Sequence, residues 1–219
     1  MISHRTIALL LMILGSGLAQ AERYEIDPVH SRVLIRVSHA GFAQAMATLS
    51  APRGHVEFDP DAPQDARVDV ELALDRLDFG DEDWNRRMAR ADYFDSAAHP
   101  LARFVSERVE AISATELRVH GQLELRGTRA PVTLAVRINR IGRDLPWVPR
   151  HSLGASATAT LDRREFGMRK HAGAVGQSVE LMIEVEARRK RTSTRASAPA
   201  TATANPDIKD PDHANPQQR

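Results

Sequence analysis

Three side chains of this chain could take part in catalysis, metal binding or ligand recognition, namely His30, Ser31 and His39. His30 and His39 are nine positions apart, which separates them by roughly 30 Å along a straight strand, so we do not expect them to share a metal ion. Ser31 lacks the G-x-S-x-G context of a nucleophile elbow. His39 has the spacing of an inward-facing strand residue. Its ring is predicted either to hydrogen-bond the polar end of a ligand or to be satisfied by the backbone or a nearby Asp.

The other ionisable residues show no catalytic pattern. Residues 81–83 read Asp-Glu-Asp and open a predicted helix. Carboxylates stabilise a helix N-terminus, and this role is favoured over paired-carboxylate catalysis. There is no cysteine, which excludes thiol chemistry, disulfides and Cys-ligated metals. The sequence therefore predicts no catalytic residue, no resident metal and no cofactor. Metal binding at the surface remains an alternative for the other histidines, none of which has H-x-H or H-E-x-x-H spacing: His55, His99, His120, His151 and His171.

The composition is that of one globular domain. Of the 219 residues, 42% are hydrophobic and 27% are charged, which suits a single core with short extensions. The 30 Lys and Arg residues nearly balance the 29 Asp and Glu residues. Nucleic-acid binders carry a basic excess that displaces counterions, so this balance argues against a nucleic-acid partner.

The N-terminal segment has the pattern of an export signal. Arg5 precedes an apolar run over residues 6–14, and Ala19-Gln20-Ala21 has the small-x-small pattern of a cleavage site. These features are typical of a secretory signal peptide, and the apolar run is too short to span a bilayer. We expect residues 1–21 to be removed after Ala21 and the protein to be periplasmic.

The C-terminal segment differs from the body in another way. Residues 190–219 are rich in Ala, Thr and Pro and are expected to be disordered, which leaves 22–189 as the folded domain. A basic run lies at this boundary. It is predicted either to be a solvated flank or to contact anionic lipid headgroups, at roughly 1 kcal/mol per residue, through Arg188, Arg189, Lys190 and Arg191.

The body of the chain alternates apolar and polar residues with a period of two, which predicts strands buried on one face. About seven or eight such strands with turns between them favour an antiparallel barrel or sandwich. One helix is expected near Glu82–Ala91, because Trp84, Arg87, Met88 and Ala91 recur at helical spacing, and it would cap one end. The clearest alternating windows are residues 33–39, 56–58, 68–74, 117–125, 132–138, 153–161 and 179–185.

Small residues at inward positions raise the question of whether the interior is hollow. Gly121 and the alanines of the 153–161 strand would leave space that larger side chains normally fill. The alternative is that bulky partners such as Phe104 or Trp147 pack against them. An eight-stranded barrel is wide enough to hold an elongated ligand. For a hollow barrel, strand parity assigns the ligand-binding lining to Val33, Ile35, Val37, His39, Phe58, Val70, Leu72, Phe104, Leu123, Leu134 and Ala157.

Several short motifs occur in an order that resembles the YceI-like family of periplasmic lipid- or polyisoprenoid-binding proteins. Each motif alone is weak, but their order and spacing over residues 23–187 make the resemblance specific. The motifs are Tyr24-Glu-Ile-Asp-Pro-Val-His-Ser31, His39-Ala-Gly-Phe42, Gly54 with Phe58-Asp-Pro60, Asp92-Tyr-Phe-Asp95, Pro100-Leu-Ala-Arg-Phe104-Val-Ser106, Gly121-Gln-Leu-Glu-Leu-Arg-Gly-Thr128, Pro131-Val132 and Asp162-Arg-Arg-Glu-Phe-Gly-Met168.

The resemblance implies an all-β fold, an eight-stranded antiparallel lipocalin-like barrel with an apolar tunnel. It further implies that the tunnel holds a polyisoprenoid chain or a quinone-like tail, and that the protein assembles as a homodimer. On this basis the chain is expected to be a non-catalytic periplasmic lipid carrier. Two alternatives remain open. One is a ligand-free interaction module of envelope stress or redox pathways, and the other is an enzyme acting on a small amphiphile, whose turnover would depend on His39.

The chain departs from the family pattern at two places. Ala43, Ala47 and Leu49 stand where members often carry Ser, Gly and Phe. The usual Arg-Asp-x-His-Leu-Arg stretch reads Trp84-Asn-Arg-Arg-Met-Ala89. The second change removes a histidine from the predicted capping helix, which indicates a divergent branch with altered headgroup contacts.

Overall fold

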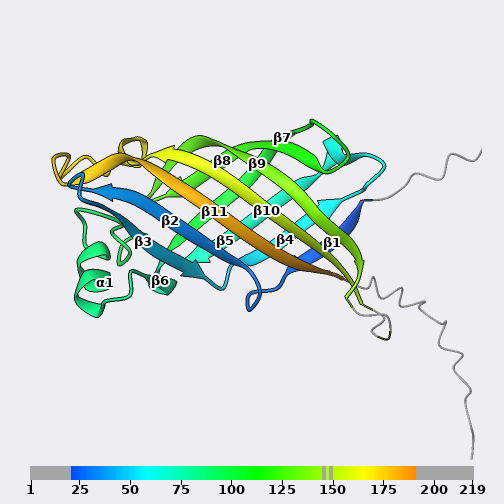
Figure 1. Cartoon of the computed structure of the whole chain (residues 1–219), viewed down its shortest axis with the longest axis horizontal. Coiled ribbons are helices and arrows are strands. Elements are labelled where there is room, and N and C mark those ends of the chain that lie inside the picture. The colour runs from blue at the N-terminus through cyan, green and yellow to red at the C-terminus, as the bar shows by residue number, and fades with distance from the viewer. Residues whose placement is uncertain (1–20, 145–146, 148–149, 191–219) are drawn as a thin grey trace, which may run out of the picture.

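The computed structural model describes residues 21–144, 147 and 150–190. These residues form one antiparallel sheet of eleven strand segments and one short α-helix (Figure 1). The elements are β1 (Glu22–Ile26), β2 (Arg32–His39), β3 (Ala43–Ser50), β4 (Arg53–Phe58), β5 (Arg67–Ala73), β6 (Leu77–Asp78), α1 (Glu82–Met88), β7 (Leu101–Ala111), β8 (Glu116–Leu125), β9 (Thr128–Arg143), β10 (His151–Asp162) and β11 (Val175–Arg189).

The sheet closes on itself through β11. The first part of β11 pairs with β2 and its last residues pair with β1, so β1 and β2 act as one strand with a break. The segments β3 and β4, and likewise β5 and β6, follow the same plan. Eleven segments with three such breaks make an eight-stranded barrel (11 − 3 = 8). The predicted fold, an eight-stranded antiparallel barrel with one short helix, is confirmed.

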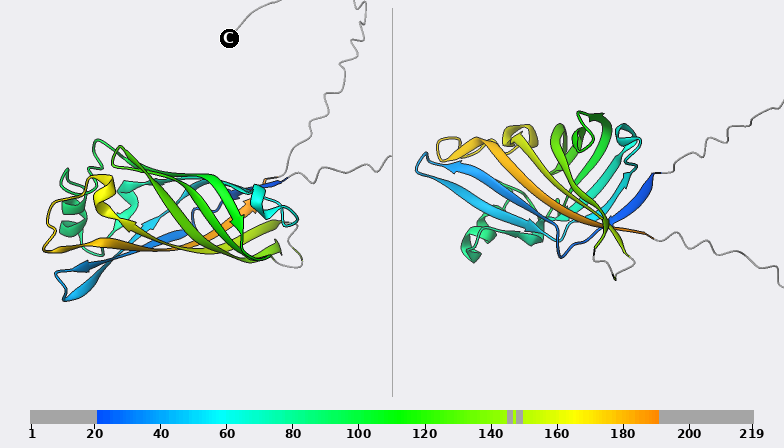
Figure 2. Two further views of the ribbon diagram at one scale, coloured as in Figure 1. Left: turned by 90° about the horizontal axis from the view of Figure 1, so that it is seen from above. Right: turned by 45° about the vertical axis from the view of Figure 1, so that its right-hand side comes forward.

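Two parts of the barrel wall therefore differ. We call β1 to β6 the interrupted wall, and the unbroken strands β7 to β11 the continuous wall. Figure 2 shows the long strands of the continuous wall curving around the barrel, while the β2–β3 hairpin projects at one end. That end also carries α1 and the β10–β11 connection (Figure 1), and we call it the mouth. The β7–β8 and β9–β10 connections lie at the opposite end.

The break between β1 and β2 is held by side chains where the ladder stops. Ser31 is fully buried, and its Oγ donates to the Glu186 carbonyl oxygen at 3.1 Å and accepts from the Glu186 N–H at 3.0 Å. The Asp27 N–H donates to the same carbonyl at 2.8 Å. These bonds satisfy backbone groups of β11 that lack a strand partner at this point, and a buried unpaired group of this kind costs stability.

The inward face of the strands is apolar, as the period-two alternation predicts. At Gly121, however, the structure favours the filled alternative, because a Cβ at this position would lie 2.7 Å from the Phe104 ring. Phe104 therefore occupies the space that Gly121 leaves, and that residue adds no volume to the interior. Trp147, the other bulky partner considered, is 77% exposed and does not fill the barrel. Ala155 and Ala157 both border the cavity inside the barrel.

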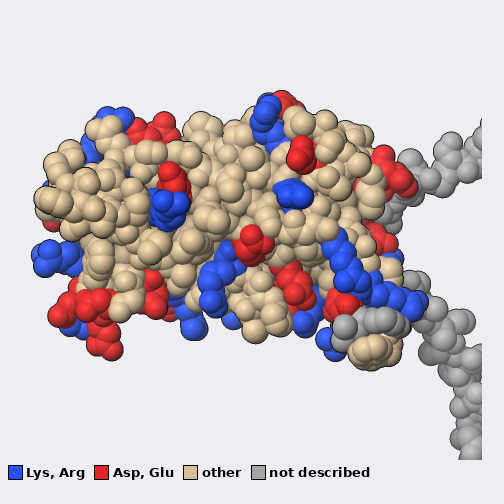
Figure 3. All heavy atoms as spheres, viewed as in Figure 1, with Lys and Arg blue, Asp and Glu red and all other residues tan. Residues whose placement is uncertain are grey.

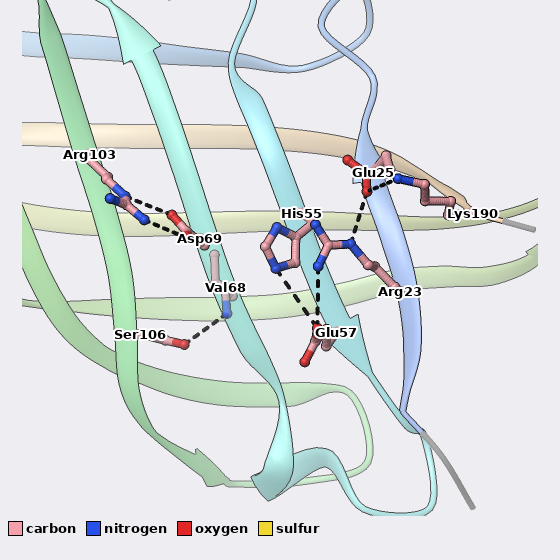
Figure 4. Close-up of polar contacts among 9 residues, drawn as sticks. All are labelled: Arg23, Glu25, His55, Glu57, Val68, Asp69, Arg103, Ser106 and Lys190. Atoms are coloured by element: carbon pink, nitrogen blue, oxygen red, sulfur yellow. Dashed lines mark hydrogen bonds and ion pairs between the residues drawn. The ribbon is translucent and has the colours of Figure 1, made fainter. Parts of the chain in front are cut away.

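The outward face of β1, β4, β5 and β7 carries a polar network (Figure 4). Arg103 binds both carboxylate oxygens of Asp69, at 3.0 and 2.8 Å, and this contact lowers the pKa of Asp69. The Ser106 Oγ accepts from the Val68 N–H at 2.8 Å, next to a register shift in the β7–β8 pairing. The Arg103–Asp69 pair joins β5 and β7 from outside and leaves the inward face free of charge at these positions. Ser106, which has the strand parity of the inward-facing Phe104, joins the same two strands through the Val68 N–H.

Candidate functional site: an apolar cavity inside the barrel

A cavity of about 760 Å³ runs through the barrel interior. Its wall is overwhelmingly aliphatic and aromatic, with side chains from strands on all sides of the barrel. Toward the end away from the mouth, its lining consists of side chains that are each less than a tenth exposed, namely Ile26, Ala66, Leu117, Ile138 and Leu153. This volume and lining are those of a site that encloses most of a small or elongated apolar ligand.

All eleven residues predicted from strand parity border this cavity. Three are fully or nearly buried parts of the core, Val33, Phe58 and Phe104, and Ala157 is 9% exposed. That these side chains contact a ligand remains a prediction. The others in the lining are partly buried, or in one case exposed at the mouth, and comprise Ile35, Val37, His39, Val70, Leu72, Leu123 and Leu134.

Polar side chains concentrate at the mouth. His39 lies at the end of β2, with its ring centroid 6.0 Å from that of Trp84. Trp84 in turn stacks on Phe79, with the centroids 5.2 Å apart. Among the described residues, no hydrogen bond satisfies the His39 ring, so the backbone or Asp partner considered from the sequence is not found. Asp81, Asp83 and Arg87 complete this side of the mouth.

The helix α1 holds Trp84 in place through local hydrogen bonds. Asp81 is the N-cap and accepts from the Trp84 N–H at 2.8 Å, which confirms the capping role expected for this acidic run. The Asn85 side chain accepts from the Phe79 N–H at 2.7 Å and donates to Asp78 at 2.9 Å. The helix ends at Met88, earlier than the predicted Ala91, and it covers the mouth beside β6.

Next to His39, the β10–β11 connection forms a lip of the mouth, which a buried arginine supports. Arg163 is 4% exposed, and its guanidinium donates to the carbonyl oxygens of Met168, Val175 (3.1 Å) and Gly176 (2.9 Å). Burial lowers the pKa of Arg163, although a guanidinium keeps its charge in proteins. Three carbonyl dipoles thus stabilise a buried cation and fix the shape of the lip.

A contact across the mouth joins this lip to the segment after α1. The rings of Tyr93 and His171 stack with centroids 5.3 Å apart and an interplanar angle of 11°. Lys170 forms an ion pair with Asp92, and this contact lowers the pKa of the Asp92 carboxyl. Sequence reasoning missed Phe79, Tyr93 and His171 as cavity residues. They lie on irregular segments without strand periodicity, so only the shared motif around Asp92 signalled this region.

One cluster outside the cavity has metal-ligand chemistry. Asp27, His30 and Glu186 offer ligand atoms within 4.8 Å of one another. The Arg188 guanidinium lies 2.6 Å from Asp27 Oδ2, and His30 Nδ1 lies 2.9 Å from the same oxygen. The oxygen that a cation would need is therefore already engaged by a cation and a histidine. This cluster acts as a polar knot at the β1–β2 break.

The basic run at the end of the domain lies away from the mouth. Arg188 contacts Asp27, Arg189 lies 2.7 Å from Glu22, and Lys190 lies 3.6 Å from Glu25 (Figure 4 shows the last pair). These carboxylates neutralise much of the local positive charge. Arg191, the rest of the predicted tail and residues 1–20 of the predicted signal peptide lie outside the described residues. Among the described helices, none is long and apolar enough to cross a membrane.

Comparisons with known proteins place the chain in a family. The YceI-like domain model matches residues 24–187. A UPF0312 protein of Azotobacter vinelandii is 31% identical over 190 residues, covering 84% of this chain and 98% of that protein. One of Pseudomonas putida is 32% identical over 182 residues, covering 82% and 93%.

Solved structures show the same fold. BcnA of Burkholderia cenocepacia superposes with a TM-score of 0.66 at 21% identity, covering 74% of this chain and 98% of BcnA. A polyisoprenoid binding domain from Saccharophagus degradans, implicated in plant cell wall breakdown, superposes with a TM-score of 0.57 at 13% identity, covering 76% and 98%. The motifs, the closed barrel and the family match over residues 24–187 together establish that this chain belongs to the YceI-like family.

Proposed function

We propose that this protein is an exported, non-catalytic carrier that holds the apolar tail of a polyisoprenoid or isoprenoid-quinone lipid inside the barrel. The observation that carries the proposal is the cavity of about 760 Å³ with its almost wholly apolar wall. The description of the S. degradans relative as a polyisoprenoid binding domain supports the same class of cargo.

The physical basis is the removal of apolar surface from water. Each buried CH₂ group contributes about 0.8 kcal/mol, so a few prenyl units provide affinity without any polar contact. The polar and aromatic groups at the mouth, among them His39, Trp84 and Arg87, are placed to contact the head of a cargo whose tail points toward Leu153. A carrier of this kind needs no reacting group, and apart from Arg32 and Glu184 the ionisable side chains that border the cavity lie at the mouth.

The first test identifies the cargo directly. The protein is purified from the periplasm without detergent, and an organic extract is examined by mass spectrometry. A stoichiometric isoprenoid lipid is the expected result. A protein without extractable lipid that also takes up no added isoprenoid would overturn the proposal and favour a ligand-free interaction module.

The second test blocks the cavity at two positions. Leu72→Glu places a charge in the apolar lining, and Ala157→Phe fills the space above a small residue. Both are expected to lower lipid occupancy at least about tenfold, since burying a charge or losing several CH₂ contacts exceeds 1.4 kcal/mol. Two matched controls make the same changes on exposed side chains, Leu101→Glu on β7 and Ala135→Phe on β9. Unchanged occupancy in both cavity variants would show that the cargo does not lie in this cavity.

Two further properties complete the proposal. The family resemblance implies a homodimer, which sedimentation velocity of the purified protein tests directly. Export with cleavage after Ala21 is tested by N-terminal sequencing of the protein recovered from the periplasm. A mature protein that begins at Glu22 is the expected result, and an uncleaved, cytoplasmic protein would contradict it.

A further inference from the structure

The most exposed large hydrophobic side chain among the described residues lies beside the cavity mouth. Phe42 is 93% exposed at the tip of the β2–β3 hairpin. The tip is a tight turn in which the Phe42 N–H donates to the His39 carbonyl at 3.0 Å, and Ala40 and Gly41 have left-handed φ angles of 51° and 75°. The turn therefore holds the ring in solvent, and folding of the described residues buries almost none of its apolar area.

The hairpin that carries Phe42 is free of formal charge. Residues 37–52 contain no Asp, Glu, Lys or Arg, in a chain that is 27% charged. Arg36 and Arg53 lie at the two ends of this stretch. A surface hairpin of a protein that meets only water normally carries charges at its tip. A charge-free tip with an exposed aromatic ring suits a less polar environment.

A second charge-free segment lies against the first. Residues 171–179 of the β10–β11 connection and the start of β11 also contain no Asp, Glu, Lys or Arg. The Ala40 N–H donates to the Ala174 carbonyl at 2.7 Å, which ties this segment to the hairpin tip. Ala172 and Gly173 are exposed. Figure 3 shows few charged side chains over this corner of the molecule, whereas carboxylates gather where α1 lies.

These two segments form one side of the cavity mouth, since His39, Ala174 and Val175 all border the cavity. We propose that this lip, residues 39–43 with 171–175, docks on the surface of a lipid bilayer, with the Phe42 ring inserted at the headgroup boundary. The proposal rests on the proposed carrier function, because a cargo that is insoluble in water must pass between the bilayer and the cavity. Arg169, close to the lip in the chain, is exposed, and a basic side chain near an anionic bilayer surface adds to binding.

The position of the lip at the mouth would let a docked protein exchange lipid between the bilayer and the cavity. Interfacial segments bury their apolar face at the boundary between headgroups and acyl chains. With Phe42 at that depth, the mouth between the lip and Trp84 opens directly toward the acyl region. The basic run Arg188 to Lys190 lies at the far end of β11 and is paired with carboxylates. Docking through the lip would therefore bring the mouth to the bilayer, whereas contact through the basic run would bring the opposite end of the barrel to it.

The test uses the purified protein and vesicles of phosphatidylethanolamine and phosphatidylglycerol. Phe42→Ser is compared with Ile112→Ser, which removes another exposed apolar side chain (55% exposed) at the opposite end. Phe42→Ser is expected to weaken vesicle binding at least about tenfold, since insertion of one Phe side chain accounts for that factor. It is also expected to slow extraction of a fluorescent isoprenoid from the vesicles by a similar factor. Ile112→Ser is expected to change neither.

A charge pair at the lip gives an independent measurement. Ala172→Glu is expected to weaken binding to these anionic vesicles, and Ala172→Arg is expected to leave it equal or stronger. Equal binding by Phe42→Ser and the wild type, or equal losses in Phe42→Ser and Ile112→Ser, would overturn the proposal. A Phe42→Ser variant that changes the oligomeric state instead of vesicle binding would also overturn it, in favour of a second copy of this chain.

Uptake of the same isoprenoid from dilute ethanol separates this inference from the carrier function. Wild type and Phe42→Ser are expected to take up the lipid equally well by this route, because the cavity is unchanged. If the wild type takes up lipid from ethanol but binds no vesicles, the docking inference is wrong and the carrier function stands. If it takes up lipid by neither route, both are wrong.

Discussion

The continuous wall, β7 to β11, consists of strands that run the length of the barrel, whereas each strand of the interrupted wall breaks once. In the continuous wall a backbone ladder joins the neighbouring strands along their length. At the β1–β2 break, the Ser31 Oγ and the Asp27 N–H make the hydrogen bonds to β11 that a ladder would otherwise make, and His30 contacts the Asp27 carboxylate. The comparison predicts that polar side chains contribute more to stability at the β1–β2 break than on the outer face of the continuous wall.

The largest expected difference comes from Asp27, whose carboxyl is only 5% exposed. It accepts from the Val29 N–H at 2.9 Å and engages His30 and Arg188. Asp27→Ala leaves these donors unpaired and is expected to lower the free energy of unfolding by about 3 kcal/mol. Denaturant unfolding measures this loss. On the continuous wall, Glu124→Ala removes an exposed pair with Arg129 and should cost less than about 1 kcal/mol. Similar losses would remove the distinction between the walls.

A smaller difference is expected for two serines. Ser31→Ala removes both hydrogen bonds to the Glu186 backbone inside the protein, which should cost about 1–2 kcal/mol. Ser156 on β10 accepts from Asn139 at 2.8 Å and donates to Glu184 at 2.7 Å on the outer face. Ser156→Ala should stay within about 0.5 kcal/mol, because water replaces its partners. Thermal unfolding of the two variants ranks them, and a larger loss at Ser156 would contradict the comparison.

The smallest effect is a dependence on pH. The hydrogen bond and charge of Asp27 raise the pKa of His30. The stability that protonated His30 contributes is therefore fully present below its pKa in the unfolded chain, about 6.5. It is lost as the pH rises through the higher pKa of His30 in the folded protein. Unfolding of the wild type from about pH 6 to about pH 8.5 is expected to show this decline, and His30→Gln is expected to lack it. A wild-type curve parallel to that of His30→Gln would refute the role assigned to His30.

The polar knot is also expected to lose stability at low pH, when Asp27 is protonated. Burial acts to raise the pKa of Asp27, but the hydrogen bonds from His30 and the Val29 N–H and the charge of Arg188 outweigh it, so the pKa is lowered. Stability from Asp27 is thus present above its unfolded value of about 3.9 and is lost as the pH falls through the folded pKa. Asp27→Asn should flatten the wild-type decline below about pH 4. An unchanged acid slope would show that other carboxylates control it.

The sequence was most informative where the strands are regular. Alternation in β8, β9 and β11 identified inward residues, such as Leu123 and Leu134, that border the cavity. The β3 strand was not identified, because its inward residues Ala45 and Ala47 do not favour strands by type. The role of Gly121 was also ambiguous, since only the structure shows the Phe104 ring against it.

The mouth was harder to predict, because its residues meet only in three dimensions. Tyr93 and His171 stack although they are far apart in the chain, and neither lies on a regular element. The strand breaks were missed for a related reason. The polar knot depends on Glu186 and Arg188, which contact Asp27 but lie near the other end of the domain in sequence. No local pattern near Asp27 reveals those partners.

The helix α1 and the segment that follows it fill the part of the mouth between β6 and β7 without joining the ladder. Because the residues of α1 pair with no strand, substitutions in this helix are expected to leave the strand register unchanged. The departure from the family pattern over Trp84–Ala89 falls in this segment. For the proposed carrier, side chains of α1 that contact the head of a cargo could therefore change without altering the strands that enclose its tail.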